Sequence, residues 1–166
     1  MAEPQASSAP AVDVQWAASD NVDDIDEDSF SSWVEAAFSI AQPVRAGLVT
    51  IRVVDEAESA GLNEGFREKP GPTNVLAFPA DNDIPDFIEE AADELGDLVI
   101  CLPVVQREAA EQSKSVTAHM THMTVHGTLH LLGYDHISPD EAEAMESLEV
   151  QALSRLGLAN PYEADE

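Results

Sequence analysis

The sequence predicts a single α/β domain in which a sheet of about four strands packs against helices. The chain of 166 residues has the length of one domain, and its 44% hydrophobic content allows a sizeable core. Short β-branched runs alternate with segments in which apolar residues recur at helical spacing. In a helix over residues 116–132, apolar side chains would line two sides of the helix, which is typical of a helix buried at the centre of a domain.

Both ends of the chain are expected to lie outside the domain. Residues 1–10 are rich in Ala, Ser and Pro, which favours disorder, and residues 159–166 form a polar tail. The folded domain is therefore expected to span residues 11–158. The N-terminus lacks a basic region and an apolar signal core, and no apolar run approaches the roughly 18 residues of a membrane span. These features predict a cytoplasmic protein with no membrane partner.

The first part of the chain predicts one strand and one helix. Polar and apolar residues alternate over residues 12–17, as in a half-buried strand. Apolar residues then recur at helical spacing over residues 29–41 and include Trp33 and Phe38. Aromatic side chains at this spacing could form a base-stacking platform, but they belong to a core far more often. We therefore expect core residues.

A strand, a helix and a second strand follow. Residues 48–55 are rich in β-branched side chains, residues 56–67 predict a short helix, and a Pro-Gly-Pro turn leads into a strand over 73–79. Arg67 and Lys69 lie at the end of this helix. The chain has only seven cations, so this pair is either an ordinary surface pair or a clamp for an anion, and the residues alone favour neither.

An acidic segment over residues 81–95 precedes the last predicted strand, at 96–103. The carboxylates of this segment match no calcium-loop spacing, which indicates a solvated loop. Cys101 lies within the apolar strand and is the only cysteine of the chain. This position favours a small buried apolar residue over a nucleophile.

Three helices complete the predicted domain. They are expected over residues 103–114, over residues 116–132, and from Ser138 onward. Ser138 and Glu141 have the spacing of a capping box, in which each side chain bonds a backbone N–H of the first helical turn. Gly157 is expected to end the last helix.

The strongest chemical signal is the segment HGTLHLLGYDH, residues 126–136. His126 and His130 are four residues apart, so they share one helix face and can bind one ion together. Gly133 can end the helix in a left-handed conformation and so return the chain toward the site with His136. The segment therefore predicts three histidine ligands.

Three imidazoles without a fourth protein ligand indicate a tetrahedral zinc site, with one Zn²⁺ per chain and one position left for water. The spacing is also that of metzincin proteases, but their general-base glutamate would fall at Gly127, which disfavours peptide hydrolysis. Neutral ligands leave the ion its full charge, which suits a phosphodiester substrate.

His119 and His122 lie on the same helix face as His126 and His130, within an arc of about 80°. Each could line an active cleft or be a core residue whose ring nitrogens are hydrogen-bonded, and neither is predicted as a ligand.

The charge balance limits how an anionic substrate can approach. The chain has 33 acidic and 7 basic residues, a net charge of -26. Such a surface repels nucleic acid at long range unless salt screens it. The composition fits a saline cytoplasm and a merely well-solvated surface equally well.

The histidine motif, together with PTNVLAFP at residues 72–79 and GDLVICLP at 96–103, resembles the YbeY family of bacterial endoribonucleases and rRNA maturation factors. The resemblance covers roughly residues 48–156. It implies a small mixed sheet with surrounding helices. It also implies action on single-stranded RNA in rRNA maturation, including processing of the small-subunit rRNA 3′ end, and in ribosome quality control.

The resemblance also implies site residues and partners. Carried over by position, the zinc ligands are His126, His130 and His136, the functional arginine is Arg67, and Lys69 follows in the same basic motif. Arg67 would then be catalytic, and both cations would bind substrate. The implied partners are rRNA and the ribosome or its small-subunit proteins. An alternative function is a ribosome-assembly binding factor with a mainly structural zinc. The acidity departs from common family forms, so a helper protein or the ribosome could supply the positive surface.

Overall fold

The structure is a computed structural model, and it describes residues 11–41, 47–79, 94–134 and 138–158. The two predicted tails, most of the acidic segment and His136 lie outside these residues. Predictions about them therefore stay predictions. No helix in the described ranges is both long and apolar enough to cross a bilayer.

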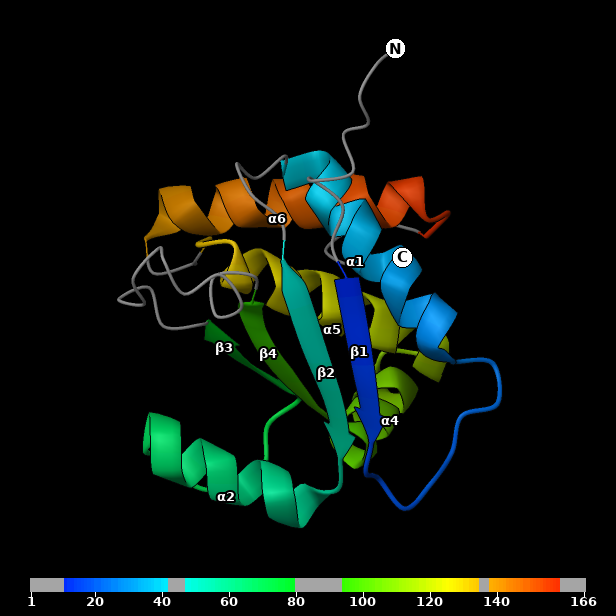
Figure 1. The fold of residues 1–166 in the computed structure, drawn as a ribbon, viewed down its shortest axis with the longest axis vertical. Coiled ribbons are helices and arrows are strands. Elements are labelled where there is room, and N and C mark those ends of the chain that lie inside the picture. The colour runs from blue at the N-terminus through cyan, green and yellow to red at the C-terminus, as the bar shows by residue number, and fades with distance from the viewer. Residues whose placement is uncertain (1–10, 42–46, 80–93, 135–137, 159–166) are drawn as a thin grey trace.

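A four-stranded mixed sheet forms the middle of the domain, in the order β1-β2-β4-β3 (Figure 1). The strands are β1 (Ala11–Trp16), β2 (Leu48–Val54), β3 (Val75–Pro79) and β4 (Glu94–Cys101). The pairs β1–β2 and β2–β4 are parallel, whereas β3 runs antiparallel to β4. The predicted fold class, a single α/β domain with a small mixed sheet, is confirmed.

The helices cover both faces of this sheet. They are α1 (Glu27–Ala41), α2 (Glu56–Arg67), α4 (Leu102–Glu111), α5 (Val116–Leu131) and α6 (Pro139–Arg155). Figure 1 shows α5 behind the strands, α1 and α6 above it, and α2 set apart near the lower ends of the strands. Successive side chains of a strand point to opposite faces, so Leu98 and Ile100 join the α1–α5 core whereas Val99 and Cys101 join the core on the α2 side.

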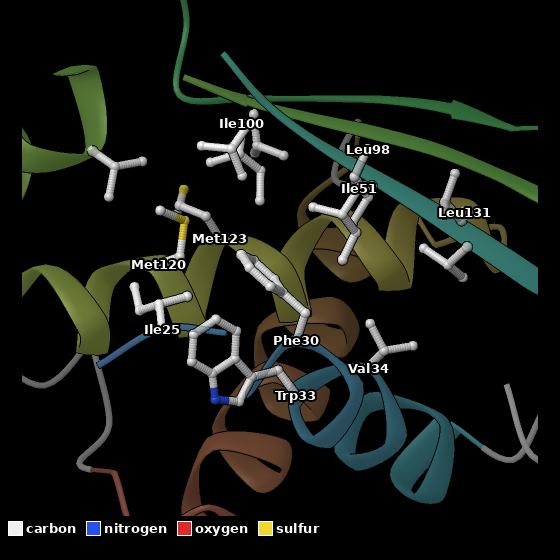
Figure 2. Close-up of a cluster of buried hydrophobic side chains, with 14 of the residues drawn as sticks. Ile25, Phe30, Trp33, Val34, Ile51, Leu98, Ile100, Met120, Met123 and Leu131 are labelled. Atoms are coloured by element: carbon white, nitrogen blue, oxygen red, sulfur yellow. The ribbon is translucent and has the colours of Figure 1, made fainter. Parts of the chain in front are cut away.

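The largest core cluster lies between the sheet and helices α1 and α5. Figure 2 shows Ile51 and Leu98 of the strands, Met120 and Met123 of α5, and Phe30 and Trp33 of α1 in one cluster. The rings of Phe30 and Trp33 meet edge to face, with centroids 5.0 Å apart. Trp33 is 7% exposed and Phe38 is 4% exposed, so both are core residues, as predicted.

The helix α5 is the buried central helix that the sequence predicts, and Gly127 brings it close to the sheet. A Cβ atom at this position would lie 2.7 Å from Leu98 Cδ2 and 3.2 Å from Val75 Cγ2. A larger residue would therefore force the side chains of Leu98 and Val75 to shift. A glutamate, which a metzincin protease would carry at this position, would displace the side chain of Leu98.

The junction of β4 and α4 differs slightly from the sequence prediction. The strand ends at Cys101 because Leu102 already begins the helix, with Pro103 in its first turn. Proline fits there because the first turn leaves backbone N–H groups without helical partners. Cys101 is fully buried, and burial raises the pKa of its thiol, which agrees with the predicted apolar role.

Candidate functional site

A cleft of about 720 Å³ lies between α5, strand β3 and the end of α2. Its walls include Arg67 from α2, Asn74 just before β3, His126 and His130 from α5, and Tyr134 just after α5. These residues come from segments far apart in the chain. The fold thus places the functional arginine implied by the resemblance in the same cleft as two predicted zinc ligands.

His126 and His130 are neighbours on one face of α5. Their ring centroids are 4.7 Å apart, and the ring planes are inclined by 77°. Beyond α5, Gly133 has a φ of +103°, a conformation that favours glycine and lets the chain leave the helix as predicted. No set of three potential metal ligands is complete within the described ranges. His136, the third predicted ligand, lies outside them.

The two described histidines fit a zinc ion. Nδ1 of His126 contacts a carboxylate oxygen of Glu149. When Nδ1 carries the donated proton, the lone pair lies on Nε2, the nitrogen that would bind a metal. Imidazoles four residues apart on a helix can serve one ion, as in other histidine zinc sites. The side chain of His126 is 21% exposed and lines the cleft, so an ion could reach it.

Arg67 ends α2 at the edge of the cleft. The helix stops because Glu68 adopts a left-handed conformation, with φ 58° and ψ 33°. Arg52 and Arg107 pair with glutamates at 2.6 and 3.0 Å, whereas no carboxylate of the described residues pairs with Arg67. Lys69 is exposed and is not among the described residues that line the cleft. The structure therefore brings Arg67 to the site but not Lys69.

The two upstream histidines are buried and bonded to carboxylates. His119 is 2% exposed, and its Nε2 lies 2.8 Å from Glu108. Burial lowers the pKa of His119, and the contact with Glu108 acts in the opposite direction. His122 Nε2 lies 3.0 Å from Glu149. Of the two roles left open by the sequence, the structure favours core residues over cleft-lining ones, although Nδ1 of His119 has no hydrogen-bond partner among the described residues.

The cleft wall before β3 is held by a network of polar groups. The amide nitrogen of Asn74 donates to both oxygens of Glu108, at 3.1 and 3.3 Å. The Asn74 side-chain oxygen accepts from the backbone of Val75, and its carbonyl accepts from the N–H of Cys101. Because Glu108 also bonds His119, this network ties the wall of the cleft to both α4 and α5.

Three residues of the site were missed by sequence reasoning. Phe66 is 68% exposed and meets Phe78 edge to face at 5.3 Å, and both rings line the cleft. Glu149 was also missed, although its position carries a signal. It lies between Met145 and Leu153 at helical spacing, on the buried face of α6. A carboxylate on such a face must be paired, so it should have prompted a search for partners.

The model of the family described as Endoribonuclease YbeY matches residues 15–157. The chain belongs to the YbeY family. YbeY endoribonucleases of three bacteria are similar over most of their length. That of Alcanivorax borkumensis is 49% identical over 92% of this chain and 86% of its own. The YbeY endoribonuclease of Alkalilimnicola ehrlichii is 47% identical over 96% of each chain. The YbeY endoribonuclease of Pseudomonas putida is 52% identical over 85% of this chain and 87% of its own.

The fold also resembles a solved structure. The solution structure of TM1509 from Thermotoga maritima matches with a TM-score of 0.55 at 21% identity, over 92% of this chain and 97% of that one. At this identity the match supports the fold alone. Membership of the YbeY family, which the histidine motif and the two strand segments predicted, is confirmed.

Proposed function

We propose that this protein is a zinc-dependent endoribonuclease that cleaves single-stranded RNA. The observation that carries the proposal is a cleft in which Arg67 from α2 lies with His126 and His130 from α5, in a chain of the YbeY family. We further propose a cytoplasmic role in rRNA maturation, including the small-subunit rRNA 3′ end, and in ribosome quality control. The partners would then be rRNA and the ribosome.

Each group at the site has a distinct role in this proposal. Zinc, held by His126, His130 and His136, would supply charge that polarises a phosphate oxygen and activates water. Arg67 would bind the same phosphate through its planar set of N–H donors and neutralise the charge that develops during transfer. No carboxylate of the described chain competes for Arg67, so its guanidinium can serve the substrate.

The test is cleavage by purified protein of verified metal content. We expect cleavage of unstructured RNA, little cleavage of duplex RNA, and none by the His130→Ala variant. Tight RNA or ribosome binding without cleavage would instead support the ribosome-assembly factor with a structural zinc. Cleavage of peptides is not expected, because the position of the protease base is occupied by Gly127, which packs against the sheet and has no side chain.

Phe66 gives the cleft a way to hold RNA that does not depend on charge. Its ring is largely exposed beside Arg67, and an exposed ring face can stack on any base. We expect Phe66→Ala to raise the KM for short unstructured RNA by about tenfold, with little change in kcat, since stacking contributes about 1–3 kcal/mol per base. Steady-state kinetics measure this, with Phe66→Tyr as the control that keeps the ring. An unchanged KM in the alanine variant would exclude a stacking role.

The salt dependence of RNA cleavage by this protein should differ from the salt dependence of nucleic-acid binding by a basic protein. Arg67, Lys69 and zinc would engage about two or three phosphates, so few counterions are released on binding. The net charge of -26 opposes the approach of RNA until salt shortens the Debye length to about 8 Å near physiological ionic strength. We expect cleavage of a short unstructured RNA to rise or stay flat from low to moderate salt, at fixed free zinc and with folding checked. A steep continuous loss would point to a larger basic surface.

A further inference from the structure

A buried carboxylate lies at the contact between α5 and α6. Glu149 of α6 has no exposed surface, although it is surrounded on this helix face by Met145, Ala152 and Leu153. Burying a carboxylate away from water is strongly unfavourable unless it is paired. An apolar side chain would pack at this position with less cost, so packing alone does not account for a glutamate.

The two oxygens of Glu149 contact two different histidines of α5. Oε1 lies 3.0 Å from Nε2 of His122, and Oε2 contacts Nδ1 of His126. His122 is itself buried, so its bond holds the carboxylate in one orientation. The second oxygen is then fixed against His126, whose ring also lines the cleft. The carboxylate thus connects the buried contact of the two helices to a predicted zinc ligand.

We propose that Glu149 is a positioning residue that orients His126 for zinc. This role rests on the proposed zinc site. By accepting the Nδ1 proton of His126, Glu149 selects the tautomer whose lone pair lies on Nε2 and prevents the ring from turning over. The negative charge also makes the imidazole a stronger ligand. Glu149 itself is not a ligand in this arrangement, because its oxygens bond the two imidazoles.

The proposal predicts a specific loss in Glu149→Gln. The amide has nearly the same shape but only one acceptor oxygen, so one of the two imidazole N–H groups loses its acceptor. We expect the zinc affinity to fall about 10- to 100-fold, measured by competition between metal-stripped protein and a chromophoric chelator. The fold of the metal-free variant would be checked by circular dichroism.

Two further variants serve as matched controls. Glu146→Gln removes the same charge from the exposed face of the same helix. Glu108→Gln weakens another carboxylate–histidine contact of the described residues, one that involves His119 and not a predicted ligand. Both should keep the zinc affinity of the wild type. Equal losses in all three variants would mean that general charge or stability, and not the contact with His126, sets the affinity, and would overturn the proposal.

A measurement on the unaltered protein keeps the proposal testable if Glu149→Gln fails to fold. Nitrogen NMR of the metal-free wild type, in alkaline buffer, should show the Nδ1–H tautomer for His126. The Nε2–H tautomer would overturn the proposed role. If the wild type binds zinc tightly and a folded Glu149→Gln variant binds it with the same affinity, only the positioning role of Glu149 is overturned. Absence of zinc binding by the wild type would overturn the proposed function together with it.

Discussion

Replacing His130 with alanine is expected to remove both zinc binding and RNA cleavage while the domain stays folded. The His130 side chain lines the cleft and is only half-buried, so its loss leaves no large cavity in the core. The ion would keep at most two of its three protein ligands, and we expect zinc affinity and cleavage each to fall by more than about 100-fold. Elemental analysis of the purified protein and cleavage of unstructured RNA measure the two effects.

A histidine outside the cleft provides the control for this variant. His119 lies on the same helix, but it is buried and bonded to Glu108. His119→Gln should retain zinc even if it lowers stability. Full zinc content in His130→Ala would remove His130 from the ligand set, and elemental analysis would also identify the native metal, since imidazoles accept nickel, copper and iron as well.

Replacing Arg67 with alanine is expected to stop the chemistry without disturbing the metal site. Arg67 is exposed at the end of α2, and within the described part of the chain it has no ion pair to lose. Removing a group that stabilises transition-state charge typically costs about 100- to 1,000-fold in kcat, and we expect a loss of this size. Single-turnover cleavage at saturating RNA measures it, alongside zinc content and thermal stability.

Three comparisons locate the cause of this loss. Arg155→Ala removes the same charge from the exposed end of α6 and should cleave normally. Lys69→Ala should act mainly on KM and by less, because Lys69 lies outside the described lining of the cleft. Arg67→Lys should recover only part of the activity, since an ammonium lacks the planar donor geometry. Loss of zinc or of the fold in Arg67→Ala would make Arg67 a structural residue.

The fold was largely predictable because local patterns and tertiary packing agree. The apolar flanks of the 116–132 segment predicted a buried central helix, and α5 has that position. Ser138 and Glu141 form the predicted capping box, with side-chain bonds in both directions. The end of β4 was less certain from sequence because Cys101 and Leu102 are both apolar and suit a strand or a helix start equally well.

The site was only partly predictable because it depends on contacts between distant segments. The spacing of His126 and His130 is a local property of one helix, so their proximity followed from sequence. The partners of Glu149 lie on another helix, and only the packing of α6 on α5 reveals them. Arg67 and Lys69 are separated because Glu68 between them adopts a left-handed conformation. This conformation is uncommon for residues other than glycine, so the sequence does not predict it.

The central claim is that zinc at the histidine cleft is required for RNA cleavage. The most direct test is to strip the protein of metal, add zinc stepwise, and measure bound zinc and cleavage of an unstructured RNA in the same samples. We predict that cleavage rises in proportion to bound zinc and reaches its maximum at one ion per chain, with no rise in His130→Ala. Full cleavage by metal-free protein, or recovery of cleavage by zinc in His130→Ala, would contradict the claim.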